Sequence, residues 1–251
     1  MHPSPELISR FCDQLTRRQK IKDFEGAENG LQFNSKKSVK KIGAAVDAGA
    51  KVFAEARKRG IDYLIVHHGI HWRPVSPLRA VQKLRRQSLT KNKISVYSSH
   101  LPLDAHPLIG NNALIAADLG LKIIDWFVPY EGTAIACLCQ GIPRSKLARK
   151  LRQAYPKTYK GIEFGSAQPR KIAILSGSGR SALPYLKAAG CDTLITGELR
   201  EEHFNEAQEQ GWNLYPCGHY ATETWGVKAL ATAVAHEFQL PWEFIDTQNP
   251  L

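Results

Sequence analysis

Residues 60–68 read GIDYLIVHH, and residues 190–198 read GCDTLITGE. Both stretches join a glycine and an aspartate to a short apolar run, which is typical of a buried β-strand entered from a turn. Before each of them lies another strand-like segment, at 42–47 and at 171–176, followed by a segment of helical composition. The pattern of strand, helix and strand therefore occurs twice, and it predicts an internal duplication.

Strand-like and helical segments alternate along the chain, with strands roughly 25 to 30 residues apart, which favours βαβ units and a largely parallel sheet. We expect an α/β fold with two similar halves, residues 1–126 and 127–251. Helices are predicted near 3–19, 49–59, 76–88, 110–119, 143–154, 180–189, 201–210 and 223–237. Strands are predicted near 42–47, 62–67, 94–99, 133–139, 171–176, 192–196, 213–217 and 243–247. The irregular stretch 151–168 is expected to be a loop.

Metal-ligand candidates lie at the ends of three predicted strands. They are His67, His68, His100, Asp104, His219 and Glu223. The last four form two His-x-x-x-acid pairs at equivalent places in the two halves. Ligand sites of α/β proteins gather at the carboxyl ends of the strands. Imidazole and carboxylate without thiolate suit zinc, iron, manganese or nickel, and a carboxylate can bridge two ions.

Five of these candidates are expected to bind metal. They are His67, His68, Asp104, His219 and Glu223. One tetrahedral site needs only three or four ligands, so we expect two divalent transition-metal ions per chain. Adjacent strand residues point to opposite faces, so the strand must end at His67 and His68, where Gly69 gives the turn a permissive backbone. His100 is expected to be catalytic, as a proton carrier, because the first half already supplies two histidines.

Other residues near these motifs are weaker candidates for metal or phosphate binding. His71 and His106 flank the motifs and are expected in exposed loops, and His203 is expected on a helix face. Cys217 precedes His219 by two residues but is expected to be a core residue, as free cysteines commonly are. The Gly-rich turn at 175–180 could cradle a phosphate, although it lacks a full nucleotide-binding pattern.

Composition and charge limit the classes of function. The five cysteines are odd in number and have no Cys-x-x-Cys spacing, which predicts reduced core residues. With neither a signal pattern nor a long apolar run, the expected location is cytoplasmic, without membrane contact. The net charge is +11, yet residues 191–251 contain ten acidic and two basic residues. The basic clusters favour a phosphorylated small substrate at least as much as nucleic acid, because no aromatic residues are interleaved among them.

Six short motifs, in order along essentially the whole chain, carry a family resemblance. They are ENGLQ at 28–32, VHHG at 66–69, SHLPLDA at 99–105, GNN at 110–112, TGE at 196–198 and GHYATE at 218–223. Together they resemble the GTP cyclohydrolase I type 2 homologue family, also called the NIF-three-like proteins. The resemblance implies two intertwined α/β repeats with mixed, mostly parallel sheets, a dinuclear metal centre and a ring-shaped homohexamer. It assigns metal binding to the same five residues that are predicted above.

The residues and the resemblance favour a metal-dependent hydrolase that acts on a nucleotide-like or phosphorylated small substrate. Two ions about 3.5–4 Å apart can share a water molecule, lower its pKa and stabilise the charge that develops on the attacked group. Two alternatives stay open at this point. One is a non-catalytic, hexameric metal-binding scaffold or regulator, and the other is hydrolytic opening of the purine ring of GTP.

Overall fold

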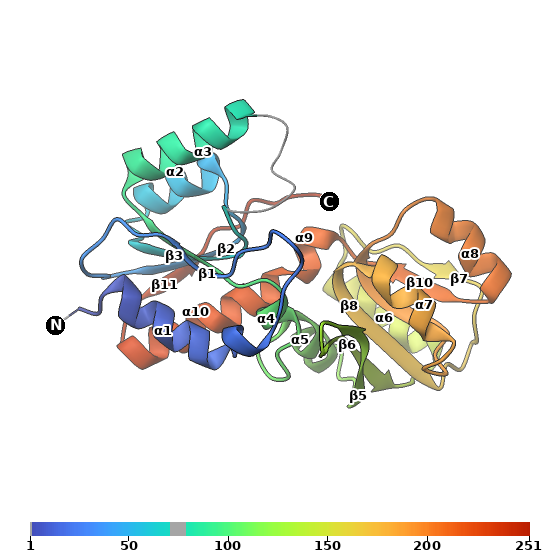
Figure 1. The fold of residues 1–251 in the computed structure, drawn as a ribbon. Coiled ribbons are helices and arrows are strands. Elements are labelled where there is room, and N and C mark those ends of the chain that lie inside the picture. The colour runs from blue at the N-terminus through green and yellow to red at the C-terminus, as the bar shows by residue number, and fades with distance from the viewer. Residues whose placement is uncertain (1, 71–78) are drawn as a thin grey trace. The chain divides into compact units, whose positions relative to one another are not determined.

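The computed structural model describes residues 2–70 and 79–251, and the chain forms two compact units (Figure 1). One unit, here called unit 1, contains the residues up to Leu103 together with Gly226–Gln248, and unit 2 contains Asp104–Trp225 and Asn249–Leu251. These units do not coincide with the consecutive halves 1–126 and 127–251. The segment Gly226–Gln248 returns to unit 1, where its strand pairs with the N-terminal sheet.

The sheet of unit 1 has the strand order β1-β4-β3-β2-β11. Its strands are β1 (Gly30–Phe33), β2 (Ile42–Asp47), β3 (Tyr63–His68), β4 (Ser95–Ser98) and β11 (Trp242–Phe244). All neighbouring pairs are parallel except β1 with β4. β3 lies at the centre and is buried along nearly its whole length, which explains why its sequence is a continuous apolar run rather than an alternating one.

Helices cover both faces of this sheet (Figure 1). The helices of unit 1 are α1 (Pro5–Leu15), α2 (Ala50–Lys58), α3 (Arg79–Asn92), the short α4 (Leu101–Asp104) and α10 (Thr224–Phe238), with a 3-10 turn, η1 (Arg18–Lys20). α2 and α3 lie on one face, and α1 and α10 lie on the other. Residues 76–78 of the helix predicted near 76–88 lie outside the described residues, and α3 begins at Arg79.

Alternation along β3 gives each face of the sheet its own core. Leu64 and Val66 belong to a buried cluster with Phe53 of α2. Tyr63 points the other way, because its hydroxyl lies 2.7 Å from the Oγ of Ser9 on α1. Side chains at successive positions of a strand face opposite sides. The central strand is therefore packed on both sides, which holds the residues at its end in place.

The sheet of unit 2 has the order β5-β6-β8-β9-β10-β7. Its strands are β5 (Ile123–Tyr130), β6 (Thr133–Gln140), β7 (Ile162–Glu163), β8 (Lys171–Ser178), β9 (Thr193–Glu198) and β10 (Asn213–Pro216). Only β8, β9 and β10 pair in parallel. The expectation of mostly parallel sheets thus holds for unit 1 and is wrong for unit 2. Three of its five pairings are antiparallel, because β6 pairs in this way with both β5 and β8, and β7 with β10. β5 and β6 form a hairpin, whose turn residues Glu131 and Gly132 both have positive φ, as a tight hairpin turn requires.

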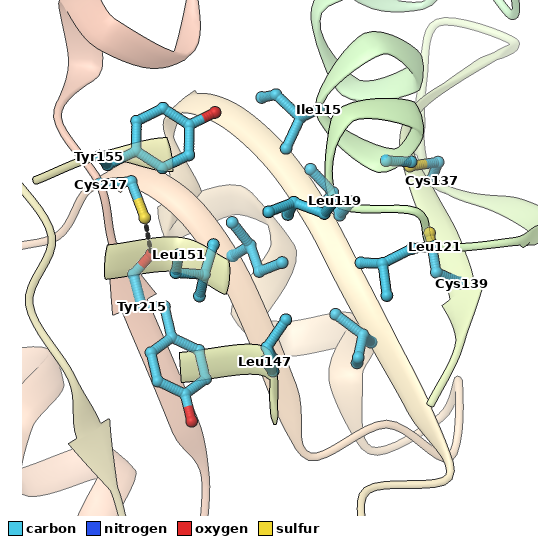
Figure 2. Close-up of a cluster of buried hydrophobic side chains, with 14 residues drawn as sticks. Ile115, Leu119, Leu121, Cys137, Cys139, Leu147, Leu151, Tyr155, Tyr215 and Cys217 are labelled. Carbon is cyan, nitrogen blue, oxygen red and sulfur yellow. Dashed lines mark hydrogen bonds between the residues drawn. The ribbon is translucent and has the colours of Figure 1, made fainter. Parts of the chain in front are cut away.

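The helices of unit 2 are α5 (Asn111–Asp118), α6 (Arg144–Ala154), α7 (Leu183–Leu186), α8 (Glu202–Gln210) and α9 (His219–Thr222), with a 3-10 turn, η2 (Gly179–Ala182). Side chains of α5 and α6 belong to one large apolar core. Figure 2 shows Ile115 of α5, Leu119 directly after α5, and Leu147 and Leu151 of α6 within this core. All five cysteines of the chain lie among the described residues, and each is buried and free of a disulfide. The prediction of reduced core cysteines is confirmed.

The two sheets share one arrangement. β2-β3-β4 in unit 1 and β8-β9-β10 in unit 2 are both sets of three consecutive parallel strands, and a short helix, α4 or α9, follows the last strand of each set. The repeated sequence pattern predicts this equivalence. The candidate histidines and acids lie at the carboxyl ends of these strands and in the turns that follow.

No helix in the described part of the chain combines the length and the apolar character needed to cross a membrane.

Candidate metal-binding residues

His67 and His68 are the last two residues of β3, and their rings lie side by side rather than on opposite faces. Their ring centroids are 4.9 Å apart. The ladder between β2 and β3 ends with the pair Asp47 and His68, so the regular alternation stops there. Gly69 follows, but its φ is not positive. A Cβ atom there would meet the end of the Gln32 side chain, which would have to shift, and Gln32 Oε1 accepts the N–H of Ile70 at 2.6 Å.

His100 joins this pair and completes a cluster of three histidines in unit 1. Its ring centroid lies 4.8 Å from that of His67 and 5.6 Å from that of His68. One ring nitrogen from each residue lies within 4.8 Å of the other two, so the three could hold a metal ion. The sequence pattern predicts that His100 is not a metal ligand. Its position, however, makes it as well placed to bind an ion as His67 and His68.

Each ring of this cluster has an oxygen atom beside its Nδ1. His67 Nδ1 lies 3.0 Å from the carbonyl oxygen of Ser99, and a carbonyl can only accept. His68 Nδ1 lies 2.8 Å from Asp47 Oδ1, and His100 Nδ1 lies 2.8 Å from Asp23 Oδ1. These contacts place a proton on Nδ1 in the neutral ring and leave the lone pair on Nε2, the arrangement that metal-binding histidines commonly have.

Asp23 and Asp47 are functional candidates that the sequence motifs do not reveal. Asp47 ends β2 in register with His68, so a carboxylate at the end of a neighbouring parallel strand was the available signal. Asp23 lies in the loop after η1, and nothing in the local sequence links it to His100. Burial raises the pKa of the Asp23 carboxyl, but hydrogen bonds from His100 and its other donors outweigh burial and lower the pKa below its usual value.

In unit 2, His219 and Glu223 lie one turn apart on and after α9. His219 Nε2 is 3.1 Å from Glu223 Oε1, and His219 Nδ1 is 3.2 Å from Glu198 Oε1. Glu223 is buried, whereas the Glu198 side chain is half exposed. Burial lowers the pKa of His219, but the two carboxylates outweigh it and raise the pKa to about 9. As in the histidines of unit 1, an oxygen atom lies beside Nδ1. The Nε2 atom of His219 lies beside Glu223, a second candidate metal ligand.

Asp104, the last residue of α4, is buried and belongs to unit 2, where other polar side chains of the same unit hold it. Its Oδ1 accepts hydrogen bonds from Asn111 Nδ2 at 2.7 Å and from Ser176 Oγ at 3.0 Å. Asn112 donates to the Asp104 carbonyl oxygen at 3.3 Å, and its Oδ1 accepts from the backbone N–H of Ser176 at 2.7 Å. The consecutive asparagines are both completely buried. They connect Asp104 to the end of β8.

The Gly-rich turn after β8 serves this group of residues instead of forming an open phosphate cradle. Gly177 has φ +63°, and a Cβ atom there would collide with the Glu223 carboxylate and lie 3.1 Å from His219 Nε2. Its backbone N–H donates to Thr222 Oγ1 at 3.1 Å. The N–H groups of Ser176 and Gly177 are therefore engaged by side chains, and the glycine allows the close approach of His219 and Glu223.

The remaining candidates have structural roles. His106 is buried rather than exposed, and its Nδ1 accepts the N–H groups of Leu108 and Ile109, both at 3.1 Å. His203 is buried on α8, where its Nδ1 accepts the N–H of Arg200 at 2.8 Å. Cys217 is a core residue whose buried thiol has its pKa raised to about 12. His71 lies outside the described residues.

The whole chain matches one protein family. Residues 6–250 match the family model described as Duf34/NIF3 (NGG1p interacting factor 3). The chain is 35% identical over 247 residues to a GTP cyclohydrolase 1 type 2 homolog of Archaeoglobus fulgidus, which covers 97% of this chain and 98% of the relative. It is 37% identical over 250 residues to the protein of the same name from Escherichia coli K12, with 97% and 98% covered.

Solved structures agree with this match. The crystal structure of TTHA1606 from Thermus thermophilus has a TM-score of 0.86 and 35% identity, and covers 99% of this chain and 100% of that one. Protein ybgI, described as of unknown function, has a TM-score of 0.90 and 32% identity, with 99% and 100% covered. The family resemblance that the sequence motifs carry is confirmed, and the chain belongs to the Duf34/NIF3 family.

Proposed function

We propose that this protein is a metal-dependent hydrolase that binds two divalent transition-metal ions per chain. One observation carries the proposal: every histidine of the two groups keeps an oxygen atom at Nδ1. These residues are His67, His68, His100 and His219, with Ser99, Asp47, Asp23 and Glu198 as the respective partners. Such partners fix the tautomer and orientation of metal-binding histidines and raise their basicity.

The donor set fits a transition metal. The proposed ligands are the five predicted from the sequence, which are His67, His68, Asp104, His219 and Glu223. They offer imidazole and carboxylate donors, and the raised pKa of Cys217 keeps its buried thiol protonated and outside the set. Zinc, iron, manganese and nickel all accept these donors, whereas a soft thiolate site would require deprotonated cysteine.

The chemistry divides between the ions and the side chains. Bound ions would lower the pKa of a water molecule and stabilise negative charge on the attacked group. His100 is held at Nδ1 by Asp23 and lies beside His67 and His68, where its Nε2 can hold or move a proton. The net charge of +11 favours an anionic substrate, and the shared name of the relatives makes GTP the first nucleotide to test.

Metal content and turnover on the same preparation test the proposal. We expect about two equivalents per chain after reconstitution with zinc, iron, manganese or nickel, and metal-dependent hydrolysis of a member of a panel of nucleotides and phosphoesters. Less than half an equivalent with each metal would refute metal binding. Full metal content without turnover of any panel member would favour a metal-binding scaffold, and release of formate from GTP would identify opening of the purine ring.

We also propose that the chain assembles into a homohexamer, as the family resemblance implies. The uneven charge supports the proposal, because residues 191–251 contain ten acidic and two basic residues in a chain that is basic overall. Opposite charges on neighbouring copies can guide assembly, and their effect weakens with salt. Light scattering at micromolar concentration in physiological salt should give six times the chain mass of 28.0 kDa, and a monomer would refute assembly.

A further inference from the structure

We propose that Asp23 is the positioning residue of His100, and that it fixes the Nδ1–H tautomer that turns the Nε2 lone pair toward His67 and His68. The inference deepens the proposed metal-binding function and rests on it. Asp23 Oδ1 lies 2.8 Å from His100 Nδ1, and the side chains of Asp23 and His100 are only 4% and 9% exposed. The pair is thus shielded from water, which could otherwise replace either partner.

The surroundings of Asp23 allow only an acceptor at this position. Oδ1 accepts the backbone N–H of Phe24 at 2.7 Å in addition to His100 Nδ1. Oδ2 accepts from Asn29 Nδ2 at 2.7 Å and from the backbone N–H of Leu101 at 3.0 Å. An ionised carboxylate has only acceptor sites and can satisfy all four donors. An amide or a protonated carboxyl at residue 23 would place a donor group opposite at least one of these four donors.

Asn29 ties the loop that carries Asp23 to the backbone of His100. Its Nδ2 donates to Asp23, and its Oδ1 accepts the backbone N–H of His100 at 2.7 Å. A flip of the Asn29 amide would therefore break the contact with His100. The Asn29 amide therefore cannot turn to suit a different group at residue 23 without losing its hydrogen bond to the His100 backbone. The tautomer of His100 thus depends on the Asp23 carboxylate.

The neighbouring pair of His68 and Asp47 provides an internal comparison. The two atoms are again 2.8 Å apart, but the Asp47 side chain is 42% exposed and that of His68 is 24% exposed. Water can reach this pair and take over the role of the carboxylate. Loss of the Asp47 charge should therefore affect His68 much less than loss of the Asp23 charge affects His100. His100 needs the same tautomer whether it binds the ion or carries a proton beside it, so the inference holds for both roles.

The experiment compares Asp23→Asn with Asp47→Asn, using nitrogen NMR of labelled imidazole rings in metal-free protein at alkaline pH. In the wild type we expect the proton of His100 on Nδ1. In Asp23→Asn a large share of it should move to Nε2. In Asp47→Asn the His68 tautomer should change less. Asp62→Asn is the control for general destabilisation, because Asp62 precedes β3 at the end opposite to the histidines, where it binds Lys36 and the backbone N–H of Lys40.

Two outcomes would overturn the inference. One is a wild-type His100 with its proton on Nε2, which is measurable even if Asp23→Asn fails to fold. The other is a folded Asp23→Asn protein in which the His100 tautomer is unchanged. The tautomer is read without metal, so its result stands apart from the proposed function. A wild-type protein that has the expected tautomer but binds no zinc would refute the metal site and leave the role of Asp23 intact.

Discussion

The Oγ of Ser176 donates a hydrogen bond of 3.0 Å to Oδ1 of Asp104, 72 residues earlier in the chain. By sequence, Asp104 belongs to the first repeat, as the counterpart of Glu223. By its contacts, it belongs to unit 2, where Asn111 holds the same oxygen. A residue of the first repeat therefore belongs to the unit formed mainly by the second, and the position of this proposed ligand depends in part on the Ser176 side chain from the other half of the sequence.

Asn111→Ala should lower the free energy of unfolding by about 1–3 kcal/mol, because it leaves the buried Asp104 carboxylate with one donor fewer. Asn111 is completely buried and its Nδ2 lies 2.7 Å from Asp104 Oδ1. Urea unfolding of metal-free protein measures the effect. Asn205→Ala is the matched control, because Asn205 is exposed on α8 and should change stability by less than about 0.5 kcal/mol. Equal effects of the two substitutions would contradict the role of Asn111.

Glu223→Ala should reduce the metal content by half or more while the fold survives. Glu223 is buried beside His219 Nε2, where a shared ligand would lie. Glu198→Ala removes the other carboxylate that contacts His219, at Nδ1, and should lower metal affinity without emptying the site. Metal content and circular dichroism of both variants test the prediction. Full metal occupancy in folded Glu223→Ala protein would remove this residue from the ligand set.

The metal-free protein should lose stability as the pH rises through the range in which His219 titrates. Its pKa is about 9 in the folded chain, above the ordinary value of 6.5. A raised pKa contributes stability that is fully present below about pH 6.5 and is lost as the pH rises to about 9. The difference in unfolding free energy between wild type and His219→Gln, measured with a chelator present, should be largest near pH 6 and shrink toward pH 10. A difference that does not vary with pH would show that folding leaves the pKa of His219 unchanged.

The central elements of the fold are predictable because local sequence and tertiary environment agree there. The sequence pattern predicts a strand at 42–47, and β2 forms at Ile42–Asp47, since its apolar run is buried. β5 escapes prediction because it is an edge strand with several exposed residues and a proline at 129, which an edge strand tolerates. β7 escapes it because it has only two residues, Ile162–Glu163, within the predicted loop at 151–168.

Some of the candidate functional residues can likewise be predicted from the sequence, and others cannot. The histidines and acids can be found from the sequence because their spacing is local and repeats in both halves. Asp23 cannot, because its link to His100 spans 77 residues and is made by a loop without any periodic pattern. The position of His100 beside His67 and His68 also depends on the pairing of β3 with β4, which places the ends of the two strands together.

The substitution His100→Ala tests most directly whether His100 binds metal or transfers a proton. We expect the variant to keep most of its metal and to lose about 10²- to 10⁴-fold in turnover, the usual loss for a positioned acid or base. The reason is that five other residues are proposed as ligands, while a histidine held by a buried carboxylate is positioned to transfer a proton. Metal stoichiometry and kcat must be measured on one preparation, once the panel has identified a substrate.

His236→Ala is the matched control, because His236 is exposed on α10. One ring nitrogen from each of His67, His68 and His100 lies within 4.8 Å of the other two, so loss of metal in proportion to activity would make His100 a ligand. Unchanged metal content and turnover would instead reduce its role to packing against His67 and His68.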